Sequence, residues 1–239
     1  MTKLLGFLRV MVAGAFSVVM AALEIIMLPV DYRKGRVFHF LARVWARGVL
    51  FLCGLRVSVK GLEKLDFSST YVYVSNHASL IDIPAVVAGI PDQIRIVYKK
   101  ELEGIPVFGW GLKWGSYIAI DRTNRAEAMK SLEAAARKIS HGASVLLFAE
   151  GTRTLDGKLQ PFKRGAFNLA VRSGVPVVPL SINGSFNILP KHSLSVRGGR
   201  IELVLESPIP VDPSGGKEEE IRLMEQVHTA IASHYVNQE

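Results

Sequence analysis

A histidine and an aspartate five residues apart form the first pair in this sequence with the chemistry of a general base. His77 and Asp82 lie between an alternating apolar run, 71–74, and Pro84. At the end of a strand, one ring nitrogen of such a histidine can face the carboxylate while the other faces a substrate. The carboxylate then fixes the tautomer and stabilises the imidazolium that forms when the outer nitrogen removes a proton. A substrate with its own hydroxyl needs no protein nucleophile, so the pair predicts base catalysis.

A second polar cluster strengthens this interpretation, because a single His-x4-Asp spacing also arises by chance. The residues Glu150, Gly151, Thr152 and Arg153 follow another apolar run, 144–148. Glycine lets a backbone approach a ligand closely, and the planar fork of arginine suits phosphate. Two polar clusters at the ends of two buried strands predict one site.

Other kinds of catalytic site find little support in the sequence. Ser79 lies within the first cluster but lacks the Gly-x-Ser-x-Gly elbow of a serine hydrolase. No His, Cys and carboxylate residues have metal-ligand spacing, and no dinucleotide or nucleotide loop is present. We therefore expect neither a bound metal nor a cofactor.

Four segments, taken in order, resemble the motif blocks of the glycerolipid acyltransferase family. They are NHxxxxD at 76–82, the run 99–122, EGTR at 150–153 and VPVVPL at 175–180. The similarity covers about residues 60–210 and is greatest to the bacterial 1-acylglycerol-3-phosphate acyltransferase branch. Ala149 replaces a usual proline and Thr154 a common serine. Neither departure removes a functional group.

The resemblance implies transfer of a fatty acyl group from acyl-CoA or acyl-carrier protein to the sn-2 hydroxyl of 1-acylglycerol 3-phosphate. The product would be phosphatidic acid, made in phospholipid biosynthesis, and the thioester would be a co-substrate rather than a cofactor. His77 matches the family's base and Asp82 its orienter. Two alternatives stay open: an acyltransferase acting on a different lysophospholipid, and a non-catalytic membrane protein that binds anionic lipid.

The candidate substrate-binding residues belong to the second cluster or carry a positive charge at a position that matches the family: Glu150, Gly151, Thr152, Arg153, Lys99, Lys100, Arg122 and Lys163. Arg153 is the foremost phosphate ligand, whereas Glu150 is expected to hold the loop. Neighbouring residues of a strand point to opposite faces, so we expect only one of Lys99 and Lys100, preferably Lys100, to reach the site. Lys163 precedes a predicted helix, whose free N–H groups attract anions.

Composition indicates a membrane partner. Hydrophobic residues make up 49% of the chain and charged residues 21%, with a formal net charge of +8. The charge favours an acidic partner, and the apolar richness favours lipid over nucleic acid. Cys53 is the only cysteine, which excludes an intrachain disulfide and fits a reducing compartment. We expect a peripheral or monotopic protein on the cytoplasmic face of the inner membrane.

The N-terminal part contains two apolar segments, 4–30 and 37–55. Charges interrupt the first, which leaves an uncharged core shorter than the roughly 20 residues of a membrane span. The second carries Arg43 and Arg47 one helical turn apart. We expect residues 1–57 to form a helical hairpin that dips into one leaflet, with both arginines near head groups. A soluble helical pair that covers the sheet and a transmembrane first helix are the alternatives; a cleaved signal peptide is disfavoured.

The remaining residues, 58–239, show the alternation of strands and helices typical of an α/β domain. The predicted strands are 56–60, 71–74, 93–98, 117–120, 144–148, 175–182 and 201–205, and the predicted helices are 81–89, 124–141, 165–172 and 217–235. Because several strands are apolar throughout, we expect a mixed, mostly parallel sheet that is covered by helices. This part would be the acyltransferase domain.

Overall fold

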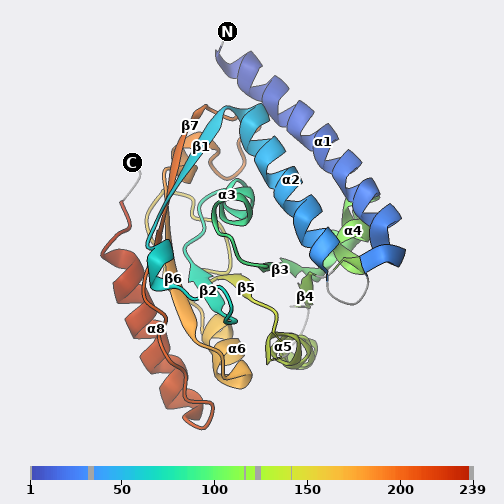
Figure 1. Ribbon diagram of the computed structural model, residues 1–239. Helices are drawn as coiled ribbons and strands as arrows, with labels where there is room; N and C mark the ends of the chain where they lie inside the picture. Colours follow the sequence, from blue (N-terminus) through green and yellow to red (C-terminus); the bar gives the residue numbers. More distant parts are fainter. Residues whose placement is uncertain (1, 32–34, 116, 122–124, 141, 237–239) are drawn as a thin grey trace.

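The computed structural model describes residues 2–31, 35–115, 117–121, 125–140 and 142–236. Within these residues, seven strands form one sheet in the order β1-β7-β6-β2-β5-β3-β4 (Figure 1). The strands are β1 (Leu55–Lys60), β2 (Val72–Ser75), β3 (Arg95–Lys99), β4 (Ile118–Ile120), β5 (Val145–Phe148), β6 (Val177–Asn183) and β7 (Gly199–Leu205). The helices are α1 (Thr2–Asp31), α2 (Arg36–Cys53), α3 (Asp82–Gly89), α4 (Phe108–Trp114), α5 (Arg125–Ser140), α6 (Gly165–Ser173), α7 (Ser185–Ile188) and α8 (Gly216–Ala232), with 3-10 turns η1 (Leu62–Lys64) and η2 (Lys100–Gly104).

The sheet is mixed and mostly parallel. Strand β2 pairs in parallel with β5 and β6, and β3 pairs in parallel with β5 and β4. Strand β7 runs antiparallel to β6 and parallel to the edge strand β1. Every residue of the central strands β2 and β6 is buried, as expected for apolar strands covered on both faces. The predicted fold class is confirmed.

Helices cover both faces of this sheet and give it three layers (Figure 1). Side chains alternate along each strand, so Tyr73 packs in the core beneath α2 and α3, whereas Val72 and Val74 pack against α5, α6 and α8. The two cores are therefore separated only by the sheet itself, and the strand ends are fixed from both sides.

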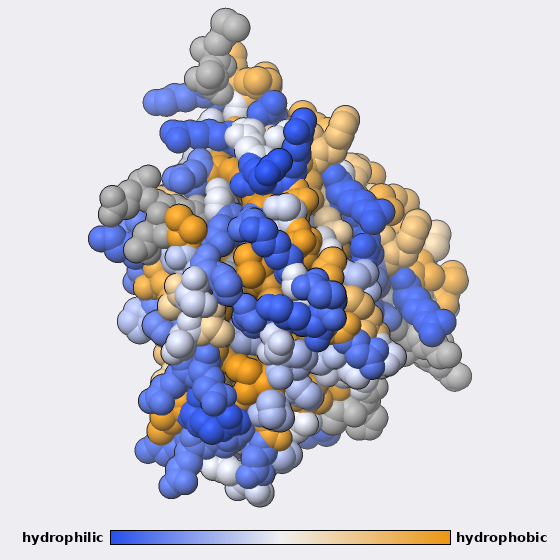
Figure 2. All heavy atoms as spheres, turned by 60° about the vertical axis from the view of Figure 1, so that its left-hand side comes forward, coloured by the Kyte–Doolittle hydropathy of each residue, from blue (hydrophilic) through white to orange (hydrophobic). Residues whose placement is uncertain are grey.

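The first two helices lie side by side on one face of the molecule (Figure 1). Helix α2 contributes Ala42, Ala46 and Leu50 to the core beside α3. Helix α1 is long and apolar enough to cross a membrane, but only 22% of its most apolar window is buried. Figure 2 shows apolar surface along its right-hand side. The large apolar side chains that α1 exposes are Leu4, Leu5, Leu8, Met11, Val12, Val19, Ile26 and Val30. The hairpin thus packs on the sheet layer and also exposes an apolar face.

Two details differ from the N-terminal expectations. The expected place of Arg43 near lipid head groups is wrong, because its guanidinium donates to the carbonyl oxygens of Ile90 (3.0 Å) and Ala88 (3.4 Å). These carbonyls end α3, where a helix lacks its own donors and carries a partial negative charge. Arg47 is exposed. Strand β1 begins at Leu55, so it crosses the boundary expected after residue 57.

Candidate active site

The two polar clusters meet where the neighbouring strands β2 and β5 end. Ser75 and Phe148, the last residues of these parallel strands, are partners in the sheet. The segment with His77 follows the first strand, and the segment with Glu150 follows the second. The carboxyl ends of parallel strands are the usual place for a ligand in open α/β sheets.

Asp82 holds the imidazole of His77 by a short contact. The distance from His77 Nδ1 to Asp82 Oδ2 is 2.7 Å. Asp82 is fully buried, and the same oxygen accepts the backbone N–H groups of Ala78 (2.8 Å) and Ser79 (2.9 Å). Asp82 also begins α3, where the helix dipole favours a negative charge. Three donors and the dipole fix the carboxylate, and the carboxylate fixes the ring.

An aromatic ring packs against the face of the His77 imidazole and restricts its rotation. The rings of His77 and Phe148 stack with centroids 3.8 Å apart and an interplanar angle of 14°. The His77 side chain is 15% exposed, so substrate can reach it. Because Nδ1 is engaged by Asp82, Nε2 is the nitrogen left for a substrate proton. Sequence reasoning missed Phe148, whose only signal is its place immediately before the second cluster.

The backbone of His77 is held by the second cluster. Its N–H donates to Glu150 Oε1 (2.7 Å), and its carbonyl accepts the N–H of Thr154 (2.9 Å). The preceding Asn76 uses its side chain to pair with both backbone groups of Ile182 in β6 (2.8 and 2.9 Å). The EGTR segment therefore positions the candidate base, a role that its composition did not reveal.

Glu150 is buried and acts as an acceptor on both carboxylate oxygens. Oε2 accepts the N–H of Gln160 at 3.3 Å. Burial raises the pKa of Glu150 to about 7, against the effect of the N–H donors from His77 and Gln160, and the charges of Asp82 and Asp156 raise it further. Through these contacts Glu150 joins the segment that carries His77 to the one that carries Gln160.

Arg153 extends from the turn that follows Glu150. Its side chain is half-buried, and burial lowers the pKa of the guanidinium, while the negative charge of Asp82 opposes this shift. Arginine keeps its charge in proteins, so the site contains a fixed cation close enough to Asp82 to feel its field. Gly151 adopts a φ of 70°, a conformation that glycine enters without strain.

Two lysines approach the same turn from other parts of the chain. A Cβ atom on Gly151 would lie 2.9 Å from Lys163 Cδ and 3.2 Å from its Nζ, so the predicted Lys163 lies directly over this glycine. Lys191 Nζ donates to Thr152 Oγ1 at 3.1 Å. Sequence reasoning missed Lys191, which follows β6 and α7 and carries no motif signal.

The other predicted basic residues are not brought to this turn. Lys99 ends β3 and pairs with Glu101 at 2.9 Å, and Lys100 pairs with Asp121 at 3.0 Å. Lys100 begins the 3-10 turn η2 instead of continuing the strand, so the argument from opposite strand faces does not apply to it. Strand β3 lies two positions from β2 in the sheet, about 10 Å away at the usual strand spacing. Arg122 lies outside the described residues.

The Ser79 hydroxyl is engaged in two hydrogen bonds to the backbone. The Ser79 hydroxyl donates to the Leu189 carbonyl (2.9 Å) and accepts the N–H of Ile81 (3.2 Å), so it closes the turn before α3. In the part of the chain that the structure describes, no group of three His, Cys, Asp or Glu residues is placed to hold a metal ion.

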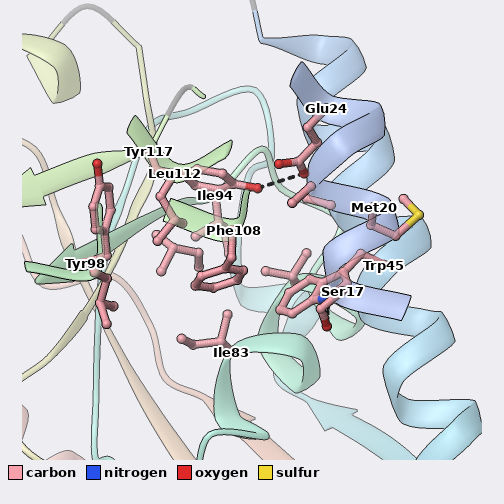
Figure 3. A pocket seen from close by; sticks show the side chains of 15 residues that line it. Ser17, Met20, Glu24, Trp45, Ile83, Ile94, Tyr98, Phe108, Leu112 and Tyr117 are labelled. Carbon is pink, nitrogen blue, oxygen red and sulfur yellow. Dashed lines mark hydrogen bonds between the residues drawn. The ribbon is translucent and has the colours of Figure 1, made fainter. Parts of the chain in front are cut away.

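An apolar cavity of about 110 Å³ lies between the N-terminal helices and the sheet (Figure 3). Ile83, the residue after Asp82, lines it together with Val87 from the same helix. Further lining residues come from α1, α2, β3 and α4, among them Met20, Trp45, Tyr98, Phe108 and Leu112. Glu24 accepts a hydrogen bond from the Tyr117 hydroxyl (3.2 Å) at one side. Phe108 of α4 lines the cavity, whereas Trp110 and Trp114 of the same helix are exposed.

Comparisons with known proteins agree with this geometry. The family model described as Acyltransferase matches residues 56–183. A 1-acyl-sn-glycerol-3-phosphate acyltransferase of Cocos nucifera is 32% identical over 231 residues, which are 95% of this chain and 72% of that protein. A chloroplastic enzyme of the same name from Brassica napus is 33% identical over 214 residues, 87% of this chain and 62% of that protein. This chain thus spans about three fifths of the length of the Brassica napus relative and, at 60%, of a similar Arabidopsis thaliana one.

Among solved structures, the crystal structure of the 1-acyl-sn-glycerophosphate (LPA) acyltransferase PlsC from Thermotoga maritima is similar over nearly the whole chain. The TM-score is 0.81 and the sequence identity 25%, with 97% of this chain and 93% of that chain covered. The similarity therefore includes the N-terminal helices as well as the sheet. The family model, the sequence relatives and this fold agree, and the chain belongs to the 1-acyl-sn-glycerol-3-phosphate acyltransferase family.

Proposed function

We propose that the protein transfers a fatty acyl group from a thioester, acyl-CoA or acyl-carrier protein, to the sn-2 hydroxyl of 1-acylglycerol 3-phosphate, which gives phosphatidic acid. The observation that carries this proposal is the contact of 2.7 Å between His77 Nδ1 and Asp82 Oδ2, beside a turn that bears Arg153. A base with a free Nε2 and a neighbouring phosphate-binding cation are what acylation of this acceptor requires.

The reaction needs no protein nucleophile. His77 Nε2 removes the proton of the acceptor hydroxyl as the oxygen attacks the thioester carbonyl carbon. The tetrahedral intermediate collapses, the carbon–sulfur bond breaks, and the imidazolium returns its proton to the leaving thiolate. Asp82 stabilises the imidazolium between these two steps and keeps its orientation. One ester bond forms, one thioester bond breaks, and the enzyme returns to its starting protonation.

Arg153 is the proposed ligand of the acceptor phosphate, because its fork presents two parallel donors and binding there would place the hydroxyl near His77. Gly151 and Thr152 belong to the same turn and Lys163 lies over it, which supports that assignment. Lys99 and Lys100 are paired with carboxylates about two strands away, so we assign them to the acidic part of the acyl donor. Arg122 remains a prediction from the sequence.

The exposed apolar face of α1 supports membrane association. We assign residues 1–57 to a membrane-associated unit that lies in one leaflet at the cytoplasmic face, and residues 58–239 to the acyltransferase domain. The cavity between these two parts is apolar and is lined by Ile83, the residue after Asp82, so we assign it to an acyl chain.

The test is product analysis with purified protein, both types of acyl donor and a panel of acceptors. We expect phosphatidic acid from lysophosphatidic acid, no product with His77→Ala, and normal binding of that variant to lipid vesicles. Wild-type rates in His77→Ala would refute the mechanism. A preference for another lysophospholipid would support the same acyl-transfer mechanism with a different acceptor. A wild-type protein that binds vesicles without turnover would instead support the alternative of a non-catalytic lipid-binding protein.

A further inference from the structure

The loop between α7 and β7 carries a cation whose charge no motif explains. In that loop, Lys191 Nζ donates to the Thr152 hydroxyl at 3.1 Å, across 39 positions of sequence. Thr152 is neutral, and no carboxylate among the described residues forms an ion pair with Lys191. Among the described residues, Lys163 and Arg153 likewise form no ion pair with a carboxylate. Three cations from three segments thus lie at the turn 151–153, and among the described residues none of them forms an ion pair with a carboxylate.

The backbone directs Lys191 to this turn. The Leu189 carbonyl accepts the hydroxyl of Ser79, which lies between His77 and Asp82. The next residue after Lys191 is His192, which has a φ of 69°, uncommon for a residue with a side chain. Strained backbone of this kind persists where the surrounding structure holds it, and it occurs often at ligand sites. The Pro190 carbonyl accepts the N–H of Ser193 at 3.1 Å and closes the turn.

We propose that Lys191 is a specificity residue that binds the phosphate monoester of the acceptor together with Arg153. This assignment rests on the proposed function and adds a residue to it. A monoester phosphate carries a second negative charge above a pKa of about 6, unlike the diester phosphate of most lysophospholipids. Arg153 matches one charge with its fork, and Lys191 supplies a point charge for the other. The pair selects the dianionic head group.

The experiment compares Lys191→Met, which keeps the length of the side chain, with Lys191→Arg and with the control Lys217→Met. Lys217 is exposed at the start of α8. The end of that helix, not its start, lies near the carboxyl end of β6, since Asn183 binds the backbone of His234 (2.9 Å) and Val236 (3.0 Å). The control therefore removes a lysine charge at the opposite end of the sheet.

We expect Lys191→Met to raise the KM for lysophosphatidic acid roughly tenfold, as for a lost contact with a charged partner, with little change in kcat. Lys191→Arg should recover most of the loss, and Lys217→Met should behave as wild type. The ratio of variant to wild-type KM should grow from pH 5.5 to pH 7.5 as the phosphate gains its second charge. Inorganic phosphate, as a competitor of the acceptor, should inhibit Lys191→Met more weakly than wild type.

Other outcomes overturn the assignment. Equal fractional losses on lysophosphatidic acid and on monoacylglycerol, which has no phosphate, would make Lys191 a support of the turn. A loss confined to the KM of the acyl donor at saturating acceptor would place the donor's phosphate at Lys191. A variant identical to Lys217→Met would remove Lys191 from the site while the proposed function stands. Failure of the wild type to acylate lysophosphatidic acid would instead refute the proposed function.

Discussion

Replacing Asp82 with asparagine tests how the base is oriented, and the contacts of Asp82 decide the outcome. An asparagine can turn either its oxygen or its amide nitrogen toward His77. The position of Oδ2 is also faced by the N–H groups of Ala78 and Ser79, at 2.8 and 2.9 Å. An amide nitrogen there would meet two donors, so the oxygen should take that place. The variant should then accept the Nδ1–H of His77 as the wild type does, and keep the same tautomer.

The cost of Asp82→Asn should therefore come from the lost charge. An imidazolium and a carboxylate about 4 Å apart attract each other by about 4 kcal/mol at an effective dielectric constant of 20, which is close to a thousandfold in rate. The retained neutral hydrogen bond offsets part of this loss, and we expect kcat to fall roughly 10²- to 10³-fold. An inverted tautomer, as in the serine-protease triad, would cost about 10⁴-fold. The amide nitrogen takes the place of Oδ1, which is buried without a hydrogen-bond partner in the described part of the protein, so some loss of stability should follow.

The assay is steady-state turnover of lysophosphatidic acid by wild type, Asp82→Asn and Asp82→Ala, with nitrogen-15 NMR of the His77 ring to identify its tautomer. We expect the Nδ1–H tautomer in wild type and Asp82→Asn, and a larger loss of kcat in Asp82→Ala. If Asp82→Asn shows the Nε2–H tautomer and a loss as great as Asp82→Ala, the two backbone donors do not orient the amide. The reasoning from their geometry would then be refuted.

Four further predictions follow from the same contacts. Phe148→Leu should lower kcat roughly two- to tenfold with little change in KM, because it removes a stacking contact with His77 that is worth about 0.5–1.5 kcal/mol. A higher KM with an unchanged kcat would contradict this prediction. Since burial raises the pKa of Glu150 to about 7, its contribution to stability is full below the unfolded value of 4.5 and is lost as the pH rises through 7. In urea unfolding between pH 4 and pH 8, the free energy of unfolding of the wild type should fall by about 3 kcal/mol relative to that of Glu150→Gln. Parallel pH profiles for the two proteins would contradict this prediction. Arg153→Ala should reduce kcat/KM for lysophosphatidic acid roughly ten- to a hundredfold but spare monoacylglycerol, and equal losses would reassign the arginine to the loop or the donor. The pair Val12→Asp and Val19→Asp, on the exposed face of α1, should release the protein from sedimented vesicles, whereas unchanged binding would place the membrane surface elsewhere.

The N-terminal prediction uses surface substitutions because a deletion would not isolate membrane binding. Helix α2 places Ala42, Ala46 and Leu50 in the core, and removal of residues 1–57 would expose that core and remove the first residues of β1. A truncated chain would then lose membrane binding and folding together. Substitutions at Val12 and Val19, which are 51% and 57% exposed, change the outward face alone.

Local patterns were sufficient to predict most of the elements. The strands β2, β5 and β6 are short apolar runs buried on both faces, and such strands can be predicted from their own residues alone. Helix α4 was missed, because two glycines in seven residues oppose a helix. Tertiary contact holds it instead: a Cβ on Gly111 would lie 3.4 Å from that of Ala21 in α1. The glycine that lowers helix propensity is what allows the close approach.

Within the candidate site, the sequence pointed to the residues proposed for chemistry more readily than to the residues that position them. His77, Asp82 and Arg153 have distinctive chemistry, and their motifs end adjacent strands, so their meeting followed from parallel pairing. Lys191 reaches the turn only through the fold, after β6 and α7, and nothing in its own neighbourhood predicts a partner.

The second motif also has a role that residue types alone do not reveal. Glu150 and Thr154 hold the N–H and the carbonyl of His77, while Arg153 between them is the proposed phosphate ligand. A phosphate bound at this turn would therefore pull on the same short segment that fixes the base. In the proposed mechanism, binding of the head group by Arg153 and placement of the imidazole are coupled through this segment, so loss of the Arg153 contact should reduce turnover as well as affinity. On this proposal, one motif serves acceptor recognition and catalysis together.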